Sequence, residues 1–394
     1  RSGGYNDIVT ESPRPIREQF LRLAARRGAG PFHRTGYYHF LGQGDFQVGQ
    51  PLSLWTLAQW EAWFDRLKLY GHSQVWLLVN GYTLAYRSRE YPEFRDPRAS
   101  AAREPGFLNT LVAAGHARGL SMYAVFTTDG HAAGMVARHP ELAAVDREGK
   151  RAADDLLCLE EPVVQRYLTT VFEEVIAETP AWDGVVFHPT ESSPVRFNGA
   201  TRAAFRAETG RELRDEPDDA VLGWCNRRFA VQMREWIGWW QARIARLDCV
   251  MFNCWWIDAH LDAYRTVLPA AARVCVRDRD YRCPDWRKRP LTGWVRAFGA
   301  ARIVFMPSSG GYPELGRPPA EEPLAGYDRL LPLAAHLTGR EVVSFAGWGA
   351  GNDEEQRLDL GLLKGCSAAL APSSESLLDS LDADWTGTRA ELLR

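Results

Sequence analysis

Three carboxylates in this sequence stand where proteins built from alternating strands and helices often carry acid–base chemistry. Glu191 comes three residues after the apolar run 184–188, and Asp129 and Asp278 follow two other apolar runs, 121–127 and 273–277. The carboxyl end of a buried parallel strand lies on the face where such folds keep their catalytic groups. A protonated carboxyl beside a carboxylate is the pair that cleaves a glycosidic bond.

We expect Glu191 to be the proton donor. His188 and Pro189 precede it and Phe187 stands in the apolar run, so a partly desolvated setting would raise the pKa of Glu191 and keep it protonated near neutrality. The alternative is a structural role, in which Glu191 caps its loop or pairs with Arg196.

The partner carboxylate is left open. Asp278 and Asp129 are the candidates for nucleophile or base, and Glu314 is a third carboxylate after a later apolar run. A structural ion pair explains each of them equally well.

The other residues at the ends of the apolar runs are of the types that bind sugars. Aromatic rings stack on the apolar face of a pyranose, and amide, imidazole, guanidinium and carboxylate groups bond to its hydroxyls. The residues expected to bind substrate are His39, Asn80, His131, His188, Trp255, Trp256, Arg277, Glu314, Trp348, Asn352 and Asp353.

A metal site is the alternative use of three of these residues. His39, His131 and His188 could ligate a metal that activates water. Because the sequence has no HxH or HExxH spacing, we expect no metal and no other cofactor.

Eight short runs rich in β-branched and aromatic residues must position these groups. They alternate with longer segments of helical periodicity, which predicts parallel βαβ units. The predicted fold is an α/β (β/α)8 TIM barrel with long strand-to-helix loops. The predicted strands are Gly36–Leu41, Gln74–Asn80, Ser121–Thr127, Gly184–His188, Cys249–Cys254, Arg273–Arg277, Arg302–Met306 and Glu341–Phe345.

Apolar spacing predicts the helices between these strands. A helix should begin at Pro162, where the missing N–H costs nothing. A second helix should carry one buried stripe from Phe229 to Leu247, because apolar residues there recur at intervals of three and four. Trp236, Trp239 and Trp240 on that helix are expected to pack in the core.

The predicted connections are unequal in length. Helix-to-strand links such as 118–120 are short, whereas strand-to-helix links are long: 81–104, 128–159, 191–218, 278–290 and 307–322. In a barrel, all the long links emerge on one face, which is the functional face. This asymmetry favours an enzyme.

No repeat, low-complexity tract or flexible linker separates a second domain from the barrel, so we expect one large domain. The chain has 394 residues, 45% hydrophobic side chains and a formal charge of −3, so we expect a sizeable core and no affinity for nucleic acid or membranes. Residues 1–34 would be an N-terminal extension packed on the barrel, 35–372 the catalytic barrel and 373–394 a closing segment. The sequence leaves a homodimer open.

The seven cysteines show no zinc-binding spacing and are odd in number, which indicates reduced, buried thiols. This favours the cytoplasm. Secretion stays open, because a removed signal peptide could precede a chain that starts Arg1-Ser2.

Several segments together resemble a group of bacterial glycoside-hydrolase barrels. They are residues 139–150, 157–164, 182–191 with the turn Asp183-Gly184 ahead of the strand, and 201–213 with Phe205, Thr209 and Gly210. The layout is similar to the β-N-acetylhexosaminidase and α-glucuronidase barrels, and the resemblance implies a catalytic acid after the fourth strand, at Glu191. Hexosaminidases that use the substrate acetamido group carry Asp-Glu there, whereas this chain has Thr190 before Glu191. The α-glucuronidase layout fits Glu191 with Asp278 better, and Arg277 would then meet a uronate.

Two functions follow from this pattern. The first is a glycoside hydrolase with a carbohydrate substrate. The second is a carbohydrate-binding pseudoenzyme on the same scaffold, which the lack of a firmly placed second carboxylate favours.

Overall fold

The computed structural model describes residues 34–39, 52–69, 72–81, 83–92, 104–130, 132–153, 156–189, 195–258, 260–278, 291–307 and 341–346. The expected N-terminal extension (apart from Arg34) and the expected closing segment 373–394 lie outside these residues.

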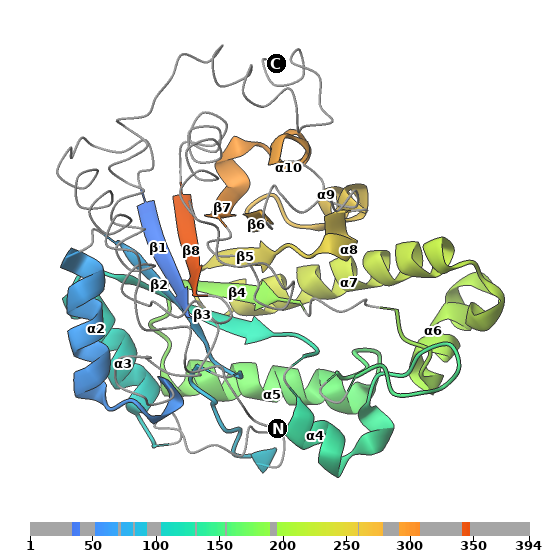
Figure 1. Cartoon of the computed structure of the whole chain (residues 1–394), viewed down its shortest axis with the longest axis horizontal. Coiled ribbons are helices and arrows are strands. Elements are labelled where there is room, and N and C mark those ends of the chain that lie inside the picture. The colour runs from blue at the N-terminus through green and yellow to red at the C-terminus, as the bar shows by residue number, and fades with distance from the viewer. Residues whose placement is uncertain are drawn as a thin grey trace, which may run out of the picture.

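Eight parallel strands form a closed barrel in chain order, with β8 paired to β1 (Figure 1). The chain therefore has the (β/α)8 TIM-barrel fold that the strand–helix alternation predicts. The predicted bounds are confirmed to the residue for β3 and β4 and differ by one or two residues elsewhere. The strands are β1 (Arg34–His39), β2 (Gln74–Leu78), β3 (Ser121–Thr127), β4 (Gly184–His188), β5 (Asp248–Phe252), β6 (Arg273–Asp278), β7 (Ile303–Pro307) and β8 (Glu341–Ala346).

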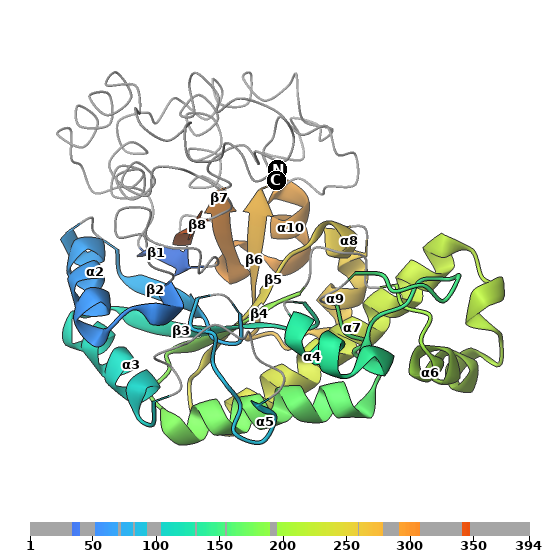
Figure 2. The ribbon, with the colours of Figure 1, turned by 60° about the horizontal axis from the view of Figure 1, so that its bottom comes forward.

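A helix follows each of the first six strands and packs against the outside of the barrel (Figure 2). The segments after β7 and β8 lie outside the described residues. The barrel helices are α2 (Leu57–Leu69), α3 (Phe107–Ala117), α5 (Pro162–Glu178), α7 (Asp218–Gln241), α9 (Leu261–Val267) and α10 (Leu291–Phe298). Further short helices lie in the connections: η1 (Leu52–Leu54), α4 (Ala133–Arg138), η4 (Pro140–Leu142), α6 (Gly199–Thr209), η5 (Leu213–Asp215), α8 (Trp255–Asp258) and η6 (Ala300–Arg302). Each described helix is too short or too polar to cross a membrane.

The helix predictions are confirmed in part. One helix begins at Pro162 as predicted, and Trp236 and Trp240 of α7 are buried in the core. The predicted extension of α7 to Leu247 is wrong, because the helix ends at Gln241. The chain turns there: Arg243 N–H bonds to the Trp240 carbonyl, and Arg246 has a positive φ of 63°, a backbone conformation that a helix cannot continue through.

The unequal connections are confirmed within the described residues. Only residues 118–120 separate α3 from β3, and 179–183 separate α5 from β4. By contrast, residues 128–161 separate β3 from α5, and 189–217 separate β4 from α7. The long connections all leave the carboxyl ends of the strands, so they build one face of the barrel.

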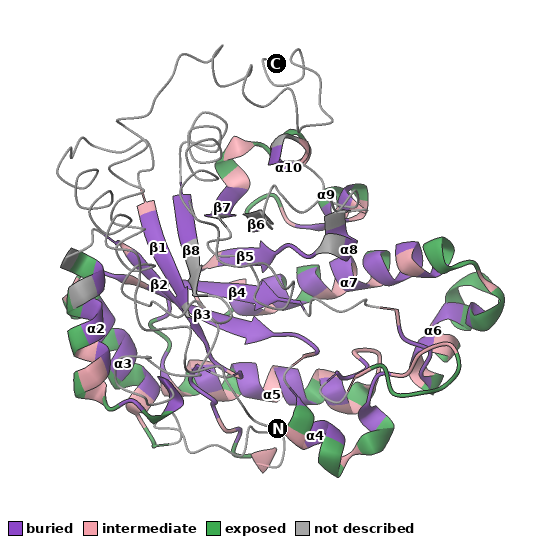
Figure 3. Cartoon of the chain, viewed as in Figure 1, coloured by how far each residue is buried: buried purple, intermediate pink, exposed green. Residues whose placement is uncertain are grey.

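The barrel interior is a packed apolar core, distinct from the larger core between strands and helices. Figure 3 shows the strands buried along most of their length. Two inward-facing glycines make room for large neighbours. A Cβ on Gly184 would lie 2.1 Å from the ring of Tyr123, and one on Gly36 would lie 2.4 Å from Gln74. The interior is filled by Tyr38, Trp76, Leu78, Tyr123, Val125, Val186, Val250, Phe252, Cys275, Val304, Met306 and Val343.

The amino-terminal end of the barrel is closed by a polar network that we call the floor: Arg34, Tyr123, Asp248, Arg273 and Glu341. Arg273 bonds to Asp248 at 2.5 Å and to Glu341 at 2.8 Å, and Arg34 bonds to Glu341 at 2.9 Å. The Tyr123 hydroxyl donates to Asp248 at 2.9 Å. Burial opposes the charge on Arg273, but Asp248 and Glu341 outweigh it and raise its pKa. The floor therefore holds two cations and two anions that satisfy one another.

Candidate functional site

His188 ends β4 at the mouth of the barrel and is 2% exposed. Its Nδ1 lies 2.7 Å from the hydroxyl of Tyr38, which reaches it from β1. Its ring packs on Phe252 of β5, with ring centroids 4.1 Å apart. This hydrogen bond fixes the orientation of the His188 ring. The tautomer of the ring depends on whether the Tyr38 hydroxyl or Nδ1 donates the hydrogen.

Asp129, the second residue after β3, is held by two neighbours. Its Oδ1 accepts a hydrogen bond from the Thr128 hydroxyl at 2.9 Å, and its Oδ2 lies 3.2 Å from Nη2 of Arg196. The side chains of Asp129 and Arg196 are each 6% exposed. The paired guanidinium favours the ionised carboxylate, which suits a base or nucleophile better than a proton donor.

Asn80 joins the ends of β2 and β3. Its Oδ1 accepts from the Thr127 N–H at 2.9 Å, and its Nδ2 donates to the Thr127 carbonyl at 3.0 Å. The side chain thereby continues the pairing of β2 with β3 beyond Leu78. The geometry gives Asn80 a structural task next to Asp129, and its predicted contact with substrate stays a prediction.

The connections after β3 and β4 are joined to each other. Within the first, antiparallel bridges join Ala143 to Leu157 and Val145 to Arg151. Asn198 of the second donates to the Ala143 carbonyl at 2.8 Å and accepts from the Val145 N–H at 3.0 Å. The two connections therefore form one wall beside the strand ends.

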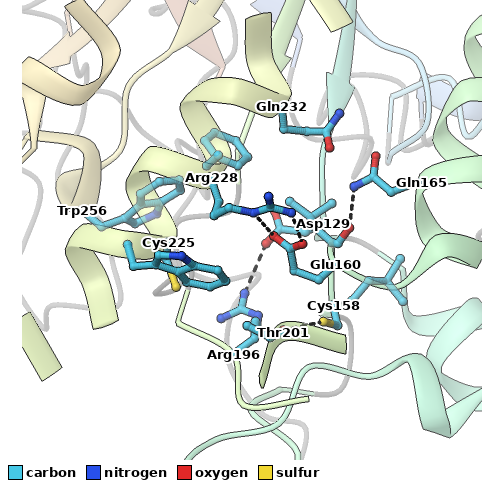
Figure 4. A pocket seen from close by; sticks show the side chains of 14 residues that line it. Asp129, Cys158, Glu160, Gln165, Arg196, Thr201, Cys225, Arg228, Gln232 and Trp256 are labelled. Atoms are coloured by element: carbon cyan, nitrogen blue, oxygen red, sulfur yellow. Dashed lines mark hydrogen bonds and ion pairs between the residues drawn. The ribbon is translucent and has the colours of Figure 1, made fainter. Parts of the chain in front are cut away.

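A pocket opens between this wall, α5, α7 and α8 (Figure 4). The cavity itself is small, about 50 Å³, and it is partly open to solvent. The pocket adjoins the ends of β3, β4 and β5 through the connections that follow them. It is lined by Asp129, Leu157, Cys158, Leu159, Glu160, Gln165, Arg196, Thr201, Trp224, Cys225, Arg228, Phe229, Gln232 and Trp256.

The charged groups on the pocket wall are paired within the wall or just behind it. Arg228 of α7 bonds to Glu160 at 2.7 Å and to Glu208 of α6 at 2.7 Å. Its hydrogen bond with Glu160 is the main reason that its pKa is raised. Asp129 and Arg196 form the second pair, so the lining has no net charge.

Two thiols on the pocket wall are uncharged. Burial raises the pKa of Cys158 to about 11 and that of Cys225 to about 12. Because the thiolate is the nucleophilic form, neither residue is suited to covalent catalysis at neutral pH. The five described cysteines are all buried and form no disulfide, as the sequence predicts.

The structure brings some of the predicted site residues together. Asp129 and Trp256 line the same pocket, and His188 and Asn80 lie at the ends of β4 and β2, the strands on either side of β3. Trp256 is buried, and its ring packs edge-on against Phe229 with centroids 5.1 Å apart.

The other predicted residues are placed only by their backbone or lie outside the described residues. Asp278 and Arg277 end β6, His39 ends β1, and Trp255 begins α8. The predictions that lie outside the described residues are Glu191, His131, Glu314, Trp348, Asn352 and Asp353. Within the described residues, no cluster of His, Cys, Asp and Glu side chains could hold a metal ion.

Sequence reasoning missed four residues of this region: Tyr38, Glu160, Asn198 and Arg228. Tyr38 lies inside a strand, and its partner is 150 positions away. Glu160 and Arg228 are 68 positions apart. Asn198 had a usable signal, since it stands directly before a helix, but that pattern predicts an N-cap and its amide instead joins two loops.

The fold is similar to that of several solved glycoside hydrolases. No protein-family model and no curated protein matches the sequence. A β-galactosidase from the psychrophilic Marinomonas ef1 aligns with a TM-score of 0.58 and 13% identity, over 89% of this chain and 60% of that one. A β-galactosidase from the haloarchaeon Halorubrum lacusprofundi gives 0.60 and 12%, over 84% and 57%.

A third similar structure, a GH20 catalytic module of the pneumococcal exo-β-D-N-acetylglucosaminidase, aligns with a TM-score of 0.54 and 11% identity, over 94% of this chain and 92% of that one. The chain spans about 60% of the length of the two β-galactosidases. The predicted resemblance to glycoside-hydrolase barrels, hexosaminidases included, is thus confirmed as a likeness of fold.

Proposed function

We propose that this protein is a glycoside hydrolase in which Glu191 donates the proton to the leaving oxygen. The observation that carries the proposal is the position of Asp129. It lies at the end of β3, on a pocket with three aromatic side chains, and β3 is paired with β4, the strand that leads to Glu191. Glycosidases need two carboxyl groups on either side of one bond, and the ends of adjacent strands can supply them.

The two carboxyl groups would have different tasks. Arg196 favours the ionised form of Asp129, so Asp129 is the proposed nucleophile or base. Asp278, at the end of β6, is the alternative for this role. His188, held by Tyr38, and Trp256 are proposed to bind the sugar beside the reacting bond. The similar fold of two β-galactosidases and an N-acetylglucosaminidase supports a carbohydrate substrate.

Replacement of Glu191 by Gln tests the assignment of the proton donor. We expect kcat to fall by about 10²- to 10⁴-fold, the range that general acid catalysis contributes, while ligand binding is kept. Glu141→Gln is the matched control, because Glu141 is exposed on the connection after β3 and pairs only with His139 among the contacts described. Full turnover in Glu191→Gln would contradict the proposal.

Asp129→Asn and Asp278→Asn identify the second carboxylate. The variant that lacks the nucleophile or base should lose turnover, and an aryl glycoside with a good leaving group should not restore it, because that group replaces only the acid.

A carbohydrate-binding protein without catalysis is the second candidate. Asp129 favours it too, because this carboxylate is buried and already engaged by Thr128 and Arg196. A panel of aryl glycosides distinguishes the two functions. A hydrolase releases the aglycone, whereas a binder shows a sugar-dependent rise in Tm without release.

A further inference from the structure

We propose that Glu160 is a specificity-determining residue that restricts the pocket beside β3 and β4 to uncharged sugars. It does so by neutralising Arg228, the arginine that projects from α7 into the pocket wall (Figure 4). The inference rests on the proposed function, since it names the substrate class of that site.

Glu160 and Arg228 meet through two contacts. Nη2 of Arg228 lies 2.7 Å from Oε2 of Glu160, and Nε lies 3.3 Å from Oε1. The contact is therefore bidentate, with both carboxylate oxygens facing the guanidinium, which is the strongest and most directional form of this pair. Figure 4 shows the guanidinium of Arg228 beside the carboxylate of Glu160.

The paired charges of the lining disfavour an anionic ligand. Four lining residues carry a formal charge, and each is matched by an opposite charge: Glu160 with Arg228, and Asp129 with Arg196. An anionic sugar would have to break one of these pairs to find a counter-charge, and would lie near the displaced carboxylate. A neutral sugar meets hydroxyl, amide and aromatic groups instead and leaves both pairs intact.

Glu160 and Glu208 contact different nitrogens of Arg228. Glu208 bonds to Nη1 of Arg228 at 2.7 Å and also accepts from the Trp224 indole. It belongs to α6 and is not among the residues that line the pocket. Removal of Glu160 therefore exposes the side of the guanidinium that faces the ligand, whereas removal of Glu208 exposes the side that faces away.

The test is a gain of affinity for an anion. Binding of glucose and glucuronate, and of galactose and galacturonate, is measured by calorimetry at equal ionic strength for the full chain and its Glu160→Gln and Glu208→Gln variants. We expect the wild type to prefer the neutral sugar of a pair. Glu160→Gln should improve the uronate-to-neutral affinity ratio by about two- to fivefold, the range for a partly exposed ion pair. Glu208→Gln should leave the ratio unchanged.

A double variant shows where the gain comes from. Glu160→Gln/Arg228→Gln should lose the uronate affinity gained in the single variant, and the gain should shrink as salt is raised. Near-ultraviolet circular dichroism checks that each variant is folded.

The proposal is overturned if the wild type binds the uronate and the neutral sugar with equal affinity, or if it binds none of the four sugars. It is also overturned if the affinity ratio is unchanged in Glu160→Gln, or if Glu208→Gln shows an equal gain. Because these outcomes concern binding, they are distinguishable from failure of the proposed hydrolysis, which release of the aglycone measures.

Discussion

The two ends of the barrel handle charge in different ways. At the floor, Arg34, Asp248, Arg273 and Glu341 neutralise one another across four strands, and the links that lead into the strands there are short. At the mouth, the connections after β3 and β4 hold the paired charges of Asp129 and Arg196 on the wall of a pocket. The floor uses ion pairs to close the barrel, whereas the mouth uses them to shape a surface that a ligand can reach.

From this difference we predict that substitutions at the floor affect stability and that substitutions at the mouth also affect function. Floor residues bond to strands that are distant in sequence, so their loss should weaken the whole fold. Residues at the mouth bond to the connections after the strands, as Arg196 does, or to a strand end next to the site, as Tyr38 does. Their loss should therefore change binding or turnover as well.

Arg273→Leu at the floor should have the largest effect. The substitution leaves Glu341, whose side chain is 4% exposed, and Asp248 without their shared cation. Breaking such a buried pair costs about 3–5 kcal/mol of unfolding free energy. Urea denaturation measures the loss. Arg265→Leu is the control, because its pair with Asp262 is exposed and should contribute little. Equal stability of the two variants would remove the contrast between floor and surface.

Gly184→Ala tests the packing above the floor. A Cβ at this position would lie 2.1 Å from the Tyr123 ring, so the ring must move inside a filled barrel. Overpacking of this kind costs about 1–3 kcal/mol. Gly238→Ala on α7 is the control, because its Cβ would meet no atom within 4 Å and alanine favours the helix by about 0.5–1 kcal/mol. Opposite shifts in Tm are expected, and a stabilising Gly184→Ala would contradict the packing argument.

The fold could be predicted from the sequence because its signal is local. Strands β3 and β4 contain continuous apolar stretches, 122–126 and 185–187, and in a barrel with helices outside, both faces of a strand are buried. The end of α7 could not be predicted. The spacing of Ile244 and Leu247 continues the helical pattern, but these residues stand beyond the helix, in the turn that contains Arg246.

The site was less predictable because its contacts join distant positions. Asp129 and Trp256 could be selected from their places after strands, and they do line one pocket. Nothing local to Glu160 indicates that it meets Arg228, since their contact depends on how the connection after β3 lies against α7. The position of Glu191 relative to these groups stays a prediction, because residues 190–194 lie outside the described residues.

Tyr38→Phe at the mouth should have a moderate effect on stability and a specific effect on His188. The variant loses one buried hydrogen bond, which is worth about 1 kcal/mol. Tyr264→Phe loses a comparable bond, from its hydroxyl to Asn226 at 2.8 Å, in the outer core. Both should lower Tm to a similar extent, but only Tyr38→Phe should change the ¹⁵N shifts of the His188 ring and, in the proposed hydrolase, kcat. Unchanged ring shifts would show that Tyr38 does not position His188.

Glu178, on the last turn of α5 near the closed end, should give the smallest effect. Burial raises its pKa, although the Leu108 N–H and Arg89 lower it. A raised pKa in the folded state means that the protonated form is the better accommodated one. Its stabilising contribution is therefore complete below the unfolded value near 4.5 and is lost as the pH rises through the folded value.

Glu178→Gln should remove this dependence on pH. Wild-type stability relative to the variant should fall as the pH rises from below 4.5 to neutrality. Urea titrations at a series of pH values measure the difference, with the exposed Glu148→Gln as control. A relative stability that instead rises with pH would mean that the contact with Leu108 outweighs burial. The closed end would then compensate this carboxylate as fully as it compensates Glu341.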